Sequence, residues 1–222
     1  MSLFKGWRDR QTRGQNVGRD AKAAQMKTLE DVFGRTAEAL RAGFPSALDL
    51  AGRQDLPRYP KAVYLGDCGV NAFVQHQNME INAFPRFLSA VREGREEVDF
   101  LFYRRGDYVS LVRFNDELAG RNVWLLTNDV ELMVRLALSR FSPPPPWVAW
   151  CEHGPFVTYN QGAPEYWYHN IWDPFWSSLT LEEQDQYIEA RGVEARSYLS
   201  EEEWEDWVYT TRRSDPRFRN DA

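Results

Sequence analysis

Two cysteines and three histidines are the residues of this chain best suited to nucleophilic or metal chemistry. Cys68 lies in the sequence Asp67-Cys68-Gly69, and His76 follows eight residues later. An imidazole beside a thiol stabilises the thiolate as an ion pair, and the thiolate is a strong nucleophile. A Cys-dependent hydrolase or transferase is therefore one candidate function. A buried structural cysteine in a turn is the alternative interpretation of the same residues.

A second group, Cys151, His153 and His169, supplies one sulfur and two nitrogen ligands of the kind that bind zinc. A carboxylate such as Glu152 would complete a tetrahedral set. The Cys-x-His spacing places two side chains awkwardly for one ion, and no second paired ligand motif accompanies it. A strand end followed by a His in a Gly-Pro turn explains the same residues without a metal.

Motifs that hold phosphates, nucleotides or catalytic metals are missing from the sequence. It contains no phosphate-binding loop, no dinucleotide-binding glycine motif, no nucleophile elbow and no paired-histidine zinc motif. We therefore predict no cofactor and favour binding over catalysis.

An aromatic cluster occupies residues 166–176, where six of eleven residues are Phe, Trp or Tyr. Such rings close a core, anchor a protein partner or stack on a sugar or base. Trp167, Trp172 and Trp176 are the candidates for a small-ligand or carbohydrate platform. The sequence does not choose between these three uses.

An acidic segment, Glu201-Glu202-Glu203-Trp204-Glu205-Asp206-Trp207, lies near the C-terminus. On a helix its two Trp share one face with Val208, so we expect the rings to pack inward and the acids to face outward. Such acids are often only a solvated surface, but they can also imitate nucleic-acid phosphate or cover a basic active site. The contact residues predicted on this basis, together with the aromatic cluster, are Trp172, Asp173, Trp176, Glu201, Glu202, Glu205 and Asp206.

Charge is distributed unevenly along the 222 residues. The net charge is −6 and the isoelectric point about 5.2. Residues 1–27 carry seven basic and two acidic side chains, whereas residues 173–209 carry eleven acidic and two basic ones. The overall charge argues against nucleic-acid and anionic-membrane binding, and the acidic end favours a protein partner with a basic surface.

The sequence favours a reducing, cytoplasmic location. The N-terminus lacks the apolar core of a signal peptide, and no run of eighteen apolar residues could span a membrane. Two cysteines do not form a disulfide framework for a chain of this length.

Hydrophobic periodicity predicts blocks of helices and strands. Helices are expected at about 20–42, 82–93 and 129–141, and strands at 61–65, 98–103, 108–114, 122–127, 147–151 and 156–159. Asn82 and Asn128 are the expected N-caps of the second and third helices. Capping boxes at Thr180 and Ser200 open two C-terminal helices, and Gly192 is expected to end the first of these. This pattern predicts an α+β fold, mainly an antiparallel sheet flanked by helices.

Three segments are expected along the chain. Residues 1–18 form a flexible basic arm, residues 19–211 a single α+β domain, and residues 212–222 a C-terminal tail. The proline-rich stretch at 142–146 is a stiff extended spacer and a candidate sub-boundary within the domain.

The profile as a whole favours a non-catalytic, cytoplasmic, protein-binding protein. An immunity- or antitoxin-type inhibitor that covers the basic active site of a toxic enzyme fits it best. A structural or assembly component of a phage or secretion-type complex, a Cys-dependent enzyme and a small-ligand binder are the alternatives. The sequence does not predict the partner's identity or the oligomeric state.

Overall fold

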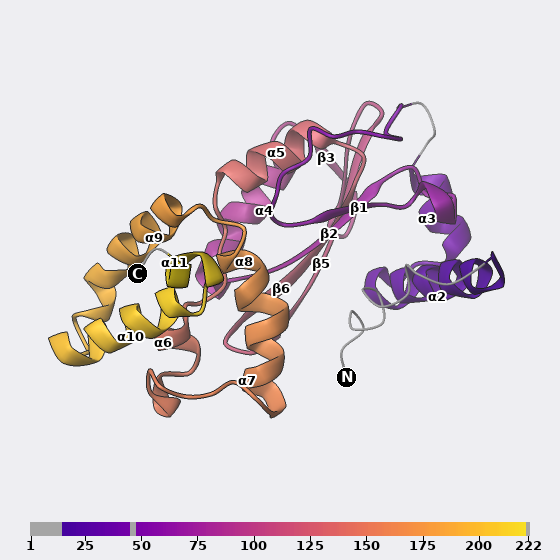
Figure 1. Ribbon diagram of the computed structural model, residues 1–222. Coiled ribbons are helices and arrows are strands. Elements are labelled where there is room, and N and C mark those ends of the chain that lie inside the picture. The colour runs from indigo at the N-terminus through magenta and orange to yellow at the C-terminus, as the bar shows by residue number, and fades with distance from the viewer. Residues whose placement is uncertain (1–14, 45–47, 221–222) are drawn as a thin grey trace.

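Six strands form one antiparallel sheet in the order β1-β2-β6-β5-β4-β3 (Figure 1). The computed structural model describes residues 15–44 and 48–220. The strands are β1 (Ala62–Tyr64), β2 (Phe73–Met79), β3 (Glu96–Asp99), β4 (Phe102–Arg105), β5 (Tyr108–Glu117) and β6 (Gly120–Thr127). Every neighbouring pair is antiparallel, and helices flank the sheet. The predicted α+β fold in a single domain is thereby confirmed.

Helices cover both faces of the sheet. Successive residues of a strand point to opposite faces, and on β5 Leu111 packs with α2 (Gln15–Phe33) whereas Val112 packs on the other side. The first face carries α2 and α3 (Ala37–Gly43), and the second carries α4 (Phe84–Arg92) and α5 (Val130–Leu138).

A third core lies among the C-terminal helices. Figure 1 shows these helices together on the side of the sheet away from α2 and α3. Trp147, Trp167, Trp204 and Trp207 are buried among them. The elements are α6 (Pro146–Ala149), α7 (Gly162–Trp167), a π-helical turn (Tyr168–Trp172), α8 (Asp173–Trp176), α9 (Leu181–Ala195), α10 (Glu201–Arg213) and α11 (Pro216–Asn220).

Several predicted elements need correction. The interior strand β2 was not predicted, and the expected strands at 147–151 and 156–159 are instead α6, a 3-10 turn (Cys151–His153) and irregular chain. The expected helix at 20–42 is two helices, because the chain turns at Gly34 with φ of +61° before Thr36 caps α3. No described helix is long and apolar enough to cross a membrane.

Helix caps were predicted with mixed success. Thr180 and Ser200 each form the expected capping box with the glutamate three residues later. Asp129, and not Asn128, caps α5, because the Asn128 amide oxygen accepts a hydrogen bond from the Val109 N–H at 2.7 Å. Asn82 does not cap α4, which follows directly on a short 3-10 turn.

The proline-rich stretch is packed and does not act as an exposed spacer. All four prolines from 143 to 146 are buried. Helix α9 holds the segment, since Tyr187 Oη lies 3.4 Å from the Pro143 carbonyl and Arg191 donates to Ser142 Oγ at 3.0 Å. The stretch therefore ties the C-terminal helices to the sheet.

The predicted terminal segments differ from the structure where it describes them. Residues 1–14 of the expected basic arm lie outside the described residues, and residues 15–18 belong to α2. Within the expected tail at 212–222, α10 extends to Arg213 and α11 occupies Pro216–Asn220.

Candidate functional site

Helix α10 presents an acidic surface because its aromatic face is buried. Trp204 and Trp207 are only 2% and 3% exposed. Their burial fixes the rotation of the helix, so that the opposite face points to solvent. We call the resulting set the acidic surface: Glu201, Glu202 and Glu205, which are exposed, and Asp206, which is half-buried.

Few cations oppose the acidic surface. Glu201 lies 3.5 Å from Arg196, and among the described residues no ion pair includes Glu202, Glu205 or Asp206. Glu203, the remaining acid of the segment, accepts from the backbone and hydroxyl of Ser200 in the capping box. Acids in a first turn also gain from the helix dipole. The acids of the acidic surface therefore need no partner to be accommodated on α10, and their negative charge remains available to bind one.

Helix α9 is held against α10 by a close approach of Gly192 to Trp204. A Cβ on Gly192 would lie 2.7 Å from Cζ2 of the Trp204 ring. Gly192 is thus a packing residue inside α9, which continues to Ala195, and not the predicted end of the helix. The outer face of α9 carries further exposed acids, namely Glu182, Asp185, Glu189 and Glu194.

The aromatic part of the predicted contact set is corrected by burial. Trp172 and Trp176 are 0% and 1% exposed, and their rings stack on each other with centroids 5.4 Å apart. Trp167 is also fully buried. Buried rings cannot touch a partner or a sugar in this fold, so the core interpretation holds for all three. Asp173 is half-buried at the start of α8.

Cys68 and His76 lie in surroundings that keep both groups neutral. Cys68 is 7% exposed beneath α2, and its thiol lies 3.3 Å from the amide oxygen of Gln25. Burial raises the pKa of this thiol. His76 stacks on Trp124 at 4.8 Å, and burial lowers its pKa to about 4. A catalytic thiolate and imidazolium require the opposite shifts.

The candidate zinc ligands do not come together. Cys151 and His153 are exposed on the 3-10 turn, where the His153 ring stacks on Trp150 at 5.5 Å. His169 is exposed on the π-helical turn with its ring edge-to-face with Tyr168. No group of three or more His, Cys, Asp or Glu within residues 15–44 and 48–220 is arranged to hold a metal.

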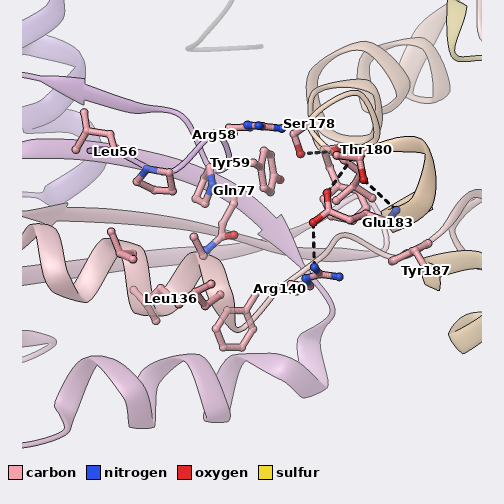
Figure 2. A pocket seen from close by; sticks show the side chains of 18 of the residues that line it. Leu56, Arg58, Tyr59, Gln77, Leu136, Arg140, Ser178, Thr180, Glu183 and Tyr187 are labelled. Carbon is pink, nitrogen blue, oxygen red and sulfur yellow. Dashed lines mark hydrogen bonds and ion pairs between the residues drawn. The ribbon is translucent and has the colours of Figure 1, made fainter. Parts of the chain in front are cut away.

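A cavity that the sequence analysis missed lies between residues 55–60, α5 and the α8–α9 region (Figure 2). Its volume is about 800 Å³. At its edge Arg140 Nη2 pairs with Glu183 Oε1 at 2.9 Å. Gln77 of β2 also lines it, but no local signal in the sequence points to this place, because β2 itself was not predicted and distant parts of the chain form the walls.

Comparisons of the chain with protein-family models, with curated proteins and with solved structures found no match.

Proposed function

We propose that this chain is a non-catalytic cytoplasmic protein of the immunity or antitoxin type, which binds a toxic enzyme and covers its basic active site. The acidic surface of α10 is the proposed contact. Enzymes that act on nucleic acid or on phosphate groups have basic clefts, and complementary charge both speeds association and selects the partner.

One observation carries the proposal, namely that the orientation of the acids is fixed by the core. Because Trp204 and Trp207 are buried, Glu202 and Glu205 cannot turn inward without unpacking α10. Neither acid has an ion-pair partner among the described residues. Because these two carboxylates already point outward and have no ion pair to break, binding a basic partner costs them little conformational entropy and no existing ion pair.

The Cys-dependent alternative has less support. A thiol with a raised pKa and an imidazole with a lowered pKa both stay neutral near pH 7, so no ion pair of thiolate and imidazolium forms. The alternative of an assembly component rested on the N-terminal arm and the proline spacer. The burial of residues 143–146 removes one of these two features.

The proposal is tested by capture from a lysate of the native host with a tagged full-length chain and a charge-neutral variant. The variant replaces each acid of the acidic surface by its amide: Glu201→Gln, Glu202→Gln, Glu205→Gln and Asp206→Asn. We expect the wild type to retain one basic enzyme in equimolar amount and to inhibit it, and the variant to retain far less. The loss amounts to about 2 kcal/mol, or roughly 30-fold in affinity, if each exposed charge contributes about 0.5 kcal/mol.

A matched control separates a local contact from the effect of net charge. It neutralises four exposed acids on the sheet part of the molecule that form no ion pair with any described residue: Asp31→Asn, Glu96→Gln, Asp107→Asn and Glu131→Gln. This variant should capture the partner as well as the wild type. Equal loss in both variants, or retention in both, would remove the acidic surface from the contact. Recovery of a multi-subunit complex without inhibited activity would favour an assembly component.

A further inference from the structure

The cavity beside β2 has the size of a small-molecule site. Its volume of about 800 Å³ lies within the range of ligand pockets, about 300–1,000 Å³. Three separate parts of the chain form its walls, namely residues 55–60, α5 and the segment from Phe175 to Ala190 (Figure 2). The cavity therefore depends on the tertiary fold and is not a groove within one element.

Most of the wall is apolar. Leu136, inside α5, and Phe141, which follows this helix, are each 3% exposed, and Phe175 of α8 is 4% exposed. Leu138 adds an exposed side chain at the edge, with 77% of its surface accessible. Apolar walls of this kind accept an acyl or aryl body, because such a body loses contact with water there.

Gln77 of β2 places a side-chain amide in the wall of the cavity. Gln77 is only 7% exposed, and it lines both this cavity and a smaller one beside it. Figure 2 shows its side chain between Tyr59 and Leu136. Gln75, two residues earlier on the same face of β2, is 3% exposed and donates to the Pro60 carbonyl at 2.9 Å. The amide of Gln77 can donate a hydrogen bond to a ligand in the cavity, as Gln75 donates one to Pro60.

A smaller, more polar cavity continues from the first. It has a volume of about 290 Å³ and shares Arg58, Tyr59, Gln77 and Ser178 with the larger one. Lys61 also lines it, and the lining of this smaller cavity includes no Asp or Glu among the described residues. Arg58 and Lys61 are exposed at this end. The two carboxylates that line the larger cavity pair with other cations, Asp55 with Arg53 and Glu183 with Arg140.

We propose that the two cavities form one binding site for a small amphipathic carboxylate. Its apolar body fills the larger cavity, its carboxylate lies near Arg58 and Lys61, and the Gln77 amide donates to the ligand where the two cavities meet. This site is separate from the acidic surface of α10, so the result of its test does not depend on the proposed inhibitor function.

The first test is calorimetric titration of the full-length protein with decanoate, a carboxylate with a ten-carbon chain, at concentrations below its micelle threshold. We expect saturable binding with a Kd below about 1 mM. Decyltrimethylammonium, which has the same apolar body and the opposite charge, should bind at least about tenfold more weakly. Absence of saturable decanoate binding, or equal binding of both compounds, would overturn the proposal.

Variants locate the ligand. Arg58→Gln with Lys61→Gln removes two exposed cations and should weaken decanoate binding about tenfold. Ala190→Trp, at an exposed position that lines the larger cavity, should block it, whereas Ala163→Trp, exposed on α7, should not. Unchanged affinity in both the double variant and Ala190→Trp would place decanoate elsewhere and contradict the assignment.

Gln77→Leu distinguishes a ligand-binding role of Gln77 from a purely structural one, because the two roles predict different changes in melting temperature and in decanoate affinity. Because the Gln77 amide faces the cavities, Gln77→Leu should leave the melting temperature nearly unchanged, while decanoate affinity falls about threefold to tenfold. The matched variant Gln75→Leu removes a made hydrogen bond and should lower the melting temperature. If Gln77→Leu lowers the melting temperature as much as Gln75→Leu and leaves decanoate binding intact, Gln77 is structural.

Discussion

The backbone of Gly192 in α9 lies against the indole ring of Trp204 in α10, so closely that a Cβ would come within 2.7 Å of Cζ2. Gly192→Ala adds that atom and gains helix propensity of about 1 kcal/mol. The overlap forces α9 and α10 apart, and we expect a net loss of about 1–3 kcal/mol in the free energy of unfolding. Urea denaturation of the wild type and of Gly192→Ala measures this difference in the free energy of unfolding.

A double-mutant cycle identifies the cause of that loss. In a Trp204→Leu background the ring is gone, so Gly192→Ala should cost much less or even stabilise through helix propensity. The same cost in both backgrounds would show that Trp204 is not the obstructing neighbour.

Two arginines contact the buried carboxylate of Asp129 in different surroundings. The Arg95 side chain is fully buried against it, whereas Arg105 reaches it at 3.4 Å with a side chain that is 44% exposed. Arg95→Met leaves a buried charge without its main partner and should destabilise by about 3–5 kcal/mol. Arg105→Met should cost less than about 1 kcal/mol. Thermal denaturation of the two variants should rank them in this order, and a reversed ranking would contradict the burial pattern.

His76 should make stability depend on pH. Burial lowers its pKa from 6.5 to about 4, so the unfolded chain binds a proton more readily than the folded one. The contribution of neutral His76 to the free energy of unfolding is therefore fully present above pH 6.5, and it is lost as the pH falls toward 4. The loss from this group between pH 7.5 and pH 5 is roughly 2 kcal/mol.

Urea unfolding at the two pH values measures the effect. His76→Gln should flatten the pH dependence, and His169→Gln, at an exposed position, serves as the matched control. A wild-type slope that survives in His76→Gln would assign the effect to other groups.

The two thiols should differ sharply in reactivity. Cys151 is exposed, whereas Cys68 is buried and its pKa is raised by burial. Iodoacetamide near pH 7.5 should alkylate Cys151 readily and Cys68 about 100-fold more slowly, and urea should abolish the difference. Mass spectrometry of Cys68→Ser and Cys151→Ser separates the two rates. Fast alkylation of native Cys68 would favour the Cys-dependent enzyme over the proposed inhibitor.

The sequence predicts elements well where one local signal decides them. The capping boxes at Thr180 and Ser200 lie where their motifs place them, because a cap needs only its own four residues. The inward face of α10 follows from the spacing of Trp204 and Trp207 in the same way. The acidic surface could therefore be predicted before the fold was known.

Elements defined by long-range packing were missed. Strand β2 is buried on both faces and carries Gln75, Gln77 and Asn78 inside, so it shows no alternation of polar and apolar residues. Its neighbours β1 and β6 supply the environment that the local sequence does not encode. The cavity beside Gln77 was missed for the same reason, since residues far apart in the chain form its walls.

Aromatic residues led to two wrong predictions, one of secondary structure and one of a partner surface. Trp147 to Cys151 have high strand propensity, yet Pro146 begins a short helix there, since its fixed φ suits a first helical turn. Trp172 and Trp176 were assigned to a partner surface because composition does not distinguish core rings from interface rings. Only the packing of α8 against α9 decides that question.

The central claim, that the acidic surface binds a basic enzyme, is tested most directly by the affinity of the captured enzyme for the wild type and the charge-neutral variant at several salt concentrations. We predict a wild-type Kd that weakens steeply with salt, and a variant Kd about 30-fold weaker at low salt with a flatter dependence. An equal Kd and an equal salt dependence for the two proteins would contradict the claim.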